Sequence, residues 1–178
     1  NAGCEVFIIH ARKAFLKGLS PAQNREIPPL NYDLVEEMKV RWPKLKIILN
    51  GGLETLEEVT KRLSKLDGVM LGRAAYKTPW VLSIVDNLIY GEQEKNKTRK
   101  DVIDMMVNYA ATQKSLGVPV KSITRHMLGL FHAEPGAKAW RKFLAEEARG
   151  LDAEPEIIRH AYFAVCEAAA LKTQGEAA

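Results

Sequence analysis

The sequence predicts an α/β fold with a parallel sheet in its first half and an all-helical second half. Three short apolar runs, 6–9, 47–49 and 68–71, alternate with segments of helical periodicity. Near-continuous apolar strands separated by helices are typical of a parallel sheet that those helices cover. Beyond the charged stretch GEQEKNKTRKD no strand-like run occurs. We therefore predict two domains, an α/β part over 1–91 and a helical part over 92–178.

A long polar segment separates the first strand from the first long helix. The run VFII predicts a buried strand that ends at His10, and the polar, proline-containing segment 11–30 follows it. An irregular loop of that length is unusual in a compact domain unless it is functional. A helix is predicted over 32–42, and Pro43 ends it. Its buried face is predicted to consist of Leu34, Val35, Met38 and Trp42.

Two further pairs of a strand and a helix complete the first half. The strand 47–49 leads into a helix that begins with a capping box, in which Thr55 and Glu58 satisfy the first free N–H groups. The strand 68–71 precedes a helix over 79–89, because a proline suits the first helical turn. The buried stripe of the capped helix is predicted to be Leu56, Val59, Leu63 and Leu66.

The helical half is predicted to hold four helices, separated by glycine and proline positions that disfavour helix. They cover 99–116, 119–131, 136–148 and 155–171. The apolar face of the last helix is predicted to consist of Ile157, Ile158, Ala161, Val165 and Ala168. Cys166 on this alanine-rich helix is predicted to be a small buried hydrophobe. Four aromatic residues at helical spacings are predicted to pack in the core: Tyr32, Trp42, Trp80 and Tyr109.

The composition limits the function classes. The 178 residues carry a net charge of +4, which is compatible with a nucleic-acid partner without being diagnostic of one. Cys4 and Cys166 form no CxxC pair, so neither a zinc site nor a disulfide framework is predicted. His126 and His132 do not share a helical face, which argues against a metal site. No run approaches the roughly 18 apolar residues of a membrane span, and no secretion leader is present. We therefore expect a reducing compartment, either cytoplasmic or organellar.

Glycines follow two of the predicted strands. Asn50, Gly51 and Gly52 come directly after the second strand, and Gly72 with Arg73 follows the third. At the carboxyl ends of parallel strands, the N–H groups of such turns and of the next helix can bind phosphate. A guanidinium can add two parallel hydrogen bonds to the phosphate oxygens. Two successive turns of this kind match the phosphate site of barrel enzymes, although each one alone is also compatible with a plain βα turn. The absence of GxGxxG and GxxxxGK[ST] motifs disfavours a Rossmann site and a P-loop.

His10 ends the first strand at the same predicted edge of the sheet. A lone histidine is more often a packed or capping residue, but its place at a strand end favours contact with a phosphate or the edge of a flavin ring. Arg12 and Lys13 follow it. The simple interpretation of these charges is a solvated loop, and a ligand-facing role for Arg12 is the alternative.

Four stretches of the sequence resemble one known family. They read IIHARKAFLKGLSPAQNREIPPL, ILNGG, DGVMLGRAAYKTPW and ITRHMLGLFHAEPGAKAWRKFL. Together they look like the carboxyl-terminal part of the A-type tRNA-dihydrouridine synthases, over nearly all of the chain to about residue 148. The resemblance implies an FMN-dependent TIM barrel with an appended four-helix tRNA-binding domain. It also implies reduction of the uridine 5,6 double bond in the tRNA D-loop, at U20 or U20a, with electrons from NADPH.

The resemblance also assigns site residues by position. The implied FMN contacts are His10, Asn50, Gly51, Gly52, Gly72 and Arg73, with the glycines and the arginine around the phosphate. The implied tRNA contacts are Arg25, Lys138 and Arg141. Ala22 stands where family members can carry a tRNA-binding lysine, so that contact would be absent here. Without the resemblance, KAWRK would be an ordinary exposed basic turn with Trp140 in the core.

The sequence departs from the family at the catalytic position. The family's catalytic cysteine, a general acid, follows a strand in the first half of the barrel and lies outside this sequence; Cys4 is assigned no catalytic role. Residues 1–91 supply only about three barrel strands, since a TIM barrel needs roughly 250 residues. We therefore expect the chain to be inactive without the amino-terminal half of the barrel. Two alternatives remain, a non-catalytic RNA-binding module derived from such an enzyme and a different phosphate-binding barrel enzyme.

Overall fold

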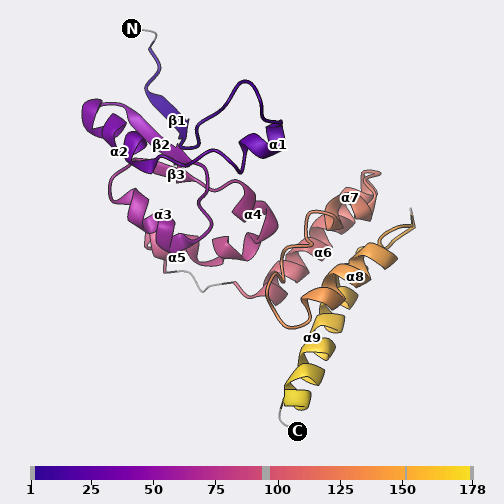
Figure 1. Cartoon of the computed structure of the whole chain (residues 1–178). Helices are drawn as coiled ribbons and strands as arrows, with labels where there is room; N and C mark the ends of the chain where they lie inside the picture. Colours follow the sequence, from indigo (N-terminus) through magenta and orange to yellow (C-terminus); the bar gives the residue numbers. More distant parts are fainter. Residues whose placement is uncertain (1–2, 94–96, 151, 177–178) are drawn as a thin grey trace. The chain divides into compact units, whose positions relative to one another are not determined.

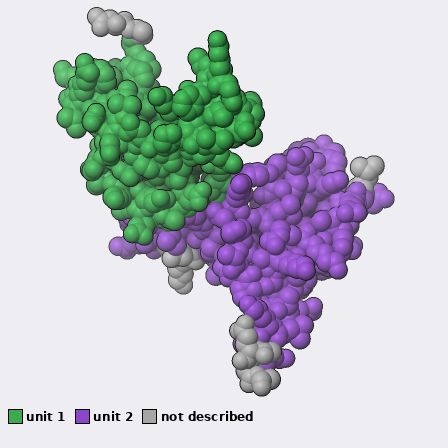
Figure 2. Space-filling model, viewed as in Figure 1, with its two compact units in different colours: residues 1–75 green, residues 76–178 purple. Residues whose placement is uncertain are grey.

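The computed structural model describes residues 3–93, 97–150 and 152–176. It divides into two compact units, Asn1–Ala75 and Tyr76–Ala178 (Figure 2). The sequence analysis predicted the domain boundary near residue 91, whereas these units divide at Ala75. The difference arises because Trp80 packs on the core of the second unit, where its ring lies 4.3 Å from the guanidinium of Arg99.

The first unit is built on a parallel three-stranded sheet with the order β1-β2-β3 (Figure 1). The register pairs His10 with Asn50 and Asn50 with Met70, so the three strands end level with one another. The elements of this unit are β1 (Val6–His10), α1 (Pro21–Asn24), α2 (Tyr32–Arg41), β2 (Lys46–Asn50), α3 (Leu56–Leu63) and β3 (Gly68–Met70), and α4 (Arg73–Lys77) extends into the second unit.

The core of the first unit lies around the central strand β2. Ile47 and Leu49 are completely buried there. The capping box of Thr55 and Glu58 starts α3 as predicted. Of the predicted stripe, Leu56 and Val59 are buried on the helix, Leu63 is half-buried, and Leu66 is buried just beyond the end of the helix. The buried residues of β2 and α3 therefore form the apolar layer between the helices and the sheet, as the periodicity indicated.

Two predictions of burial in the first unit are wrong. Strand β1 was expected to be buried, but Val6 and Ile8 are 53% and 52% exposed. Within the described residues β1 pairs only with β2, so it is an edge strand. On α2 only Val35 of the predicted face is fully buried, while Leu34 and Trp42 are exposed. The apolar pattern is present in both elements, but no described segment covers the exposed residues.

The long segment after β1 is more ordered than the sequence predicts. Ser20 and Gln23 form a capping box that starts the short helix α1. The backbone of Phe15 exchanges two hydrogen bonds with the side chain of Asn24, at 2.9 and 2.8 Å. An isolated antiparallel bridge joins Arg12 to Leu30 at the base of the segment. These bonds give the segment a defined course beside the ends of the strands.

The second unit is helical in the part that the structure describes. Its elements are η1 (Pro79–Ile84, a 3₁₀ helix), α5 (Val85–Tyr90), α6 (Arg99–Ser115), α7 (Val120–Thr124), α8 (Ala137–Glu147) and α9 (Ile157–Glu176). Helix α9 packs against both α6 and α8. The core between them includes Ile103, Val107, Trp140, Leu144, Ile158 and Ala161. The predicted placement of Trp140 in the core is confirmed, since its side chain is 0% exposed.

Helix α7 is much shorter than predicted. The sequence predicted a helix over 119–131, but the structure has helix only to Thr124 and turns beyond it. The indole N–H of Trp140 donates to the carbonyl oxygen of Met127 at 2.9 Å. Gly129 approaches the backbone of Lys77 so closely that a Cβ atom would lie 2.1 Å from its carbonyl oxygen. These tertiary contacts outweigh the local preference for helix.

Two side-chain predictions in the second unit are also wrong. Cys166 on α9 is exposed, because the buried face of this helix runs through Ile158, Ala161 and Val165. Tyr109 on α6 is 50% exposed rather than packed in the core. Among the described residues no helix is long and apolar enough to span a bilayer. The same residues include no cluster of three or more His, Cys, Asp or Glu placed to hold a metal ion.

Candidate functional site

A cavity of about 160 Å³ lies in the first unit where the three strands end. Every residue predicted for the cofactor lines it: His10, Asn50, Gly51, Gly52, Gly72 and Arg73. Arg25, predicted to contact tRNA, lines the same cavity from the long segment after β1. Lys138 and Arg141, the other predicted tRNA contacts, are exposed on α8 in the second unit. The parallel register explains the gathering, because it brings the residue after each strand to one edge.

The turn after β2 has a backbone that only glycine adopts without strain. Gly51 has φ +109° and Gly52 has φ +73°. A Cβ atom on Gly51 would lie 2.8 Å from Cε1 of the His10 ring, and one on Gly52 would lie 2.4 Å from a methyl of Leu30. The turn is tied to β1 by the amide of Ala11, which donates to the carbonyl oxygen of Asn50 at 2.8 Å. Both glycines are therefore required by the turn itself.

Gly72 differs from the two glycines of the turn. A Cβ atom built on it would meet nothing within 4 Å, and its φ is not in the left-handed region. The turn geometry alone therefore does not require glycine here. Because Gly72 lines the cavity, the absence of a side chain keeps backbone accessible to whatever enters.

The ring of His10 is held in one tautomer when it is neutral. Its Nδ1 accepts a hydrogen bond of 3.1 Å from the backbone amide of Arg12. A ring nitrogen that accepts cannot carry the proton, so Nε2 carries the hydrogen in the neutral ring. His10 therefore offers a donor at Nε2 to a ligand in the cavity.

Positive charge dominates the cavity. Three guanidinium groups line it, those of Arg12, Arg25 and Arg73, against the carboxylate of Glu54. Arg12 is already engaged, since its Nη1 donates to the carbonyl oxygens of Glu26, at 2.9 Å, and of Pro28. These bonds favour a role for Arg12 in holding the long segment in place over a role in contacting a ligand.

Arg73 keeps donor capacity for a ligand. Among the described residues its side chain pairs with one carboxylate, that of Glu26 at 3.5 Å, and the two side chains are 45% and 72% exposed. An exposed ion pair of that length is worth little. A phosphate bearing two charges would compete effectively with this single carboxylate for the guanidinium.

Tyr32 at the start of α2 supports the glycine turn from behind, and the sequence analysis missed it. Its hydroxyl donates to the carbonyl oxygen of Gly51 at 3.0 Å. In a planar trans peptide the C=O and the next N–H point in opposite directions, so this bond turns the N–H of Gly52 away from Tyr32. Gly52 lines the cavity and Tyr32 does not. The bond therefore keeps this N–H available to a ligand.

The ring of Tyr32 is itself held in place by charged side chains. The guanidinium of Arg62 lies 4.4 Å from the ring centroid, and Arg62 pairs with the carboxylate of Glu36 at 2.6 Å. These partners come from α2 and α3, far apart in the sequence. No local motif marks such a contact; helical spacing indicated only that Tyr32 would be in the core.

We expect Tyr32→Phe to lower the free energy of unfolding of the first unit by about 1 kcal/mol, the usual net worth of one hydrogen bond. The ring stacking on Arg62 remains, so the loss reports the hydroxyl. Urea unfolding of both proteins measures it. Tyr90→Phe, at an exposed tyrosine of α5, is the matched control and should change stability by less than about 0.5 kcal/mol. Equal effects of the two substitutions would contradict the role of Tyr32.

The free energy of unfolding of the wild type and that of Tyr32→Phe should depend differently on pH. Desolvation, followed by the carboxylate of Glu58, raises the pKa of Tyr32 above its usual value of 10.0. The folded state therefore holds this proton more tightly than the unfolded state. The resulting stabilisation is complete below pH 10 and is lost as the pH rises through the raised pKa. The stability difference between wild type and Tyr32→Phe should shrink when unfolding is repeated above pH 10.

Cys4 is not part of this site. It is exposed before β1, its sulfur lies 3.3 Å from the carbonyl oxygen of Val6, and it does not line the cavity. That it has no catalytic role stays a prediction.

Comparison with known proteins identifies relatives over most of the chain. A family model described as "Dihydrouridine synthase (Dus)" matches residues 1–164. A protein of Shewanella oneidensis is 47% identical over 163 residues, covering 92% of this chain and 49% of the relative. A protein of Escherichia coli strain K12 is 46% identical over 158 residues, covering 89% of this chain and 46% of the relative. One of Vibrio cholerae is 47% identical over 161 residues, covering 90% and 49%.

These three relatives share one name, tRNA-dihydrouridine(20/20a) synthase. The chain spans about half the length of the curated relatives it matches. The matched region includes the cavity at the strand ends, the segment with Arg25, and helix α8.

Proposed function

Because this chain belongs to the dihydrouridine synthase family, we propose that it is the carboxyl-terminal part of an FMN-dependent enzyme that reduces uridine to dihydrouridine in tRNA. The names of its relatives specify positions 20 and 20a, and we extend that specificity to the D-loop substrate of this protein. The observation that carries the proposal is the single cavity shared by the two glycine turns, His10 and Arg73. Shared fold alone would not justify it, since function resides in the site.

The cavity suits the phosphate end of FMN. Its volume of about 160 Å³ is several times the roughly 30 Å³ that one water takes in the liquid. The N–H of Gly52 and the exposed backbone at Gly72 are donors that a phosphate oxygen can approach closely. Arg73 adds the cation, and its weak partner Glu26 yields to a stronger anion. His10 offers its Nε2 hydrogen toward the flavin. The bound flavin would supply hydride transfer, with NADPH as the source of electrons.

The catalytic acid is proposed to lie in the part of the enzyme that precedes this sequence. The cavity lining includes no cysteine. The exposed apolar residues of β1 and Met70 on β3, at the two edges of the sheet, support pairing with further barrel strands. We propose that residues 1–91 contribute to a TIM barrel and that residues 92–178 form a helical tRNA-binding domain. By itself the chain is expected to bind ligands without turning over.

The tRNA contacts are proposed at Arg25, Lys138 and Arg141. Arg25 is exposed and lines the cavity, so it can reach RNA while the target base approaches the flavin. Lys138 and Arg141 are three positions apart on α8 and both are exposed. Such cations contact phosphates and position RNA rather than read its sequence.

The test compares FMN with riboflavin, which lacks the phosphate. We expect Arg73→Ala to weaken FMN binding by about 10- to 150-fold, the value of one or two charge-assisted hydrogen bonds, and to leave riboflavin binding unchanged. Flavin fluorescence measures both, on the chain supplemented with the amino-terminal half of a relative's barrel. Arg41→Ala, at an exposed arginine of α2 outside the cavity, is the matched control.

Three outcomes would contradict parts of this proposal. Equal FMN affinity in wild type and Arg73→Ala would remove the phosphate site. Dihydrouridine formation by the chain alone would show that the catalytic acid lies within it. RNA binding without any flavin binding in the complemented protein would favour a non-catalytic RNA-binding module.

A further inference from the structure

The second unit contains a larger cavity that the proposed flavin site does not use. Its volume is about 390 Å³, within the range of small-ligand pockets. Val102 and Met106 line it from α6, and Ile123 lines it from α7. Met127 and Leu130 complete an apolar floor from the turns that replace the predicted end of α7. A floor of this kind accepts the flat face of an aromatic ligand.

The wall of this cavity is rigid. The carbonyl oxygen of Met127 accepts the indole N–H of Trp140 at 2.9 Å, so α8 supports the turn from its other side. Trp140 is fully buried, and Thr124 at the end of α7 is buried as well. The cavity therefore exists before a ligand arrives, which lowers the entropic cost of binding.

Aromatic side chains stand at the rim. His126 and Tyr109 line the cavity, and Tyr109 is 50% exposed. The hydroxyl of Tyr76 and Nδ1 of His126 are 2.9 Å apart, and the two rings meet edge to face with their centroids 5.8 Å apart. This bond fixes the imidazole plane. The held ring of His126 and the exposed ring of Tyr109, beside an apolar floor, offer faces on which an unpaired base can stack.

The charge around the rim suits RNA. Among the residues that the structure describes, the lining of this cavity includes no carboxylate. Lys121 and Arg125, one helical turn apart, directly precede the lining residues Ser122 and His126 in the sequence, and both are exposed. Neither takes part in any of the salt bridges among the described residues. Two uncommitted cations next to an aromatic pocket can hold the phosphates that flank a base.

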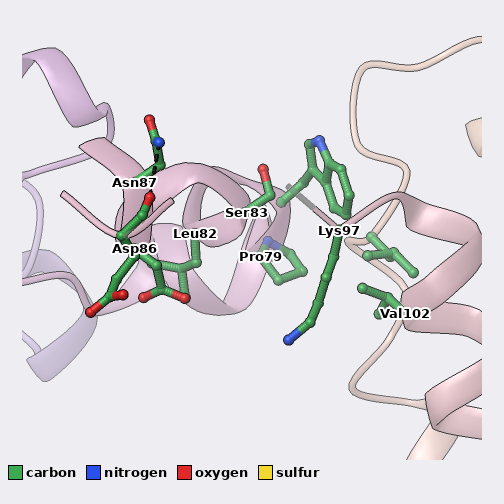
Figure 3. A pocket seen from close by; sticks show the side chains of 10 residues that line it. Pro79, Leu82, Ser83, Asp86, Asn87, Lys97 and Val102 are labelled. Carbon is green, nitrogen blue, oxygen red and sulfur yellow. Dashed lines mark hydrogen bonds between the residues drawn. The ribbon is translucent and has the colours of Figure 1, made fainter. Parts of the chain in front are cut away.

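A neighbouring cavity in the second unit has a more acidic lining. It measures about 270 Å³ (Figure 3) and shares Pro79, Val102 and Leu130 with the 390 Å³ cavity. Among the described residues, its lining includes the carboxylates of Asp86 and Glu92 and one cation, that of Lys97. Carboxylates repel an RNA backbone, so this second cavity is the less suitable of the two.

We propose that the cavity between α6 and α7 receives one unpaired nucleobase of the RNA substrate, stacked beside His126 and Tyr109. Lys121 and Arg125 hold the adjacent phosphates. The inference rests on the proposed tRNA-modifying function and adds a stacking contact with one base to the phosphate contacts on α8. An unpaired base has the aromatic faces and polar edges that this pocket complements, and RNA recognition commonly targets such bases.

The test uses a short single-stranded RNA with 2-aminopurine at one position, whose fluorescence falls when the base stacks on an aromatic ring. Wild type should bind it with quenching. His126→Ala should remove most of the quenching and weaken binding about tenfold, the effect of losing one stacked base. His160→Ala, at an exposed histidine of α9 outside the cavity, is the matched control and should behave as wild type. Circular dichroism checks that both variants are folded.

A second variant protects the test from a folding failure. Ser122 is exposed and lines the cavity, so Ser122→Leu narrows the cavity from its rim without adding an aromatic ring on which the base could stack. It should also abolish quenching. Unchanged quenching and affinity in both variants, with RNA still bound, would overturn the base pocket and leave the proposed function intact. Failure of the wild-type chain to bind RNA even at low salt would instead overturn the tRNA partner, and the pocket with it.

Discussion

Replacing Trp140 by alanine is expected to lower the free energy of unfolding of the second unit by about 3–5 kcal/mol. Trp140 is 0% exposed and lies at the centre of the helical core, with its ring centroid 4.9 Å from that of Phe131. The substitution leaves a cavity too large to close by small shifts. It also removes the donor to the carbonyl oxygen of Met127 within the core. A loss of this size is a large fraction of the stability of an ordinary domain.

Trp42→Ala is the matched control for this prediction. Trp42 is 42% exposed on the first unit and stacks on Arg41, with the guanidinium 4.9 Å from its ring. We expect its replacement to cost about 1 kcal/mol or less. Urea unfolding followed by circular dichroism compares the two variants. Equal losses would mean that Trp140 does not organise the helical core.

Replacing Gly51 by alanine is expected to lower the stability of the first unit by about 3 kcal/mol and to abolish FMN binding. The φ of +109° is strained for any residue with a side chain, and the new methyl would lie 2.8 Å from the ring of His10. To make room the ring must move, which breaks its bond to the amide of Arg12. The change therefore alters the turn and the histidine together.

Gly72→Ala separates the turn from the ligand. Its new methyl meets no atom within 4 Å and its φ is ordinary, so stability should change by less than about 0.5 kcal/mol. FMN affinity should nevertheless fall, while riboflavin affinity stays the same, because the methyl would stand where we propose that the phosphate approaches the backbone. Unfolding curves and flavin titrations on both glycine variants give the comparison. Undiminished FMN binding by Gly72→Ala would place the phosphate elsewhere.

Much of the candidate site was predictable because parallel strands end at one edge. Once the three apolar runs are recognised as strands, His10, Asn50 and Gly72 must come near one another, whatever the details of packing. The structure places them around one cavity. Their role toward FMN remains a prediction, since geometry shows a cavity of the right character and not its occupant.

The sequence analysis missed contacts that join positions far apart in the chain. Tyr32 bonds Gly51, and Arg12 bonds the carbonyl oxygens of Glu26 and Pro28. In the second unit, Tyr76 pairs with His126, fifty residues away. A helical period or a short motif carries no information about such pairs, because they depend on how separate elements pack.

The sequence by itself determined the order of strands and helices, the capped start of α3, the buried tryptophan of α8 and the glycine turns at the strand ends. These features follow from side-chain periodicity and from backbone preferences, which act within a few residues. Only the tertiary structure decided the exposure of β1, the early end of α7 and the orientation of the Gly51–Gly52 peptide. Each of these depends on which distant group donates a hydrogen bond to a given carbonyl oxygen, or on which segment covers a given face. Those partners are set only when the elements pack together.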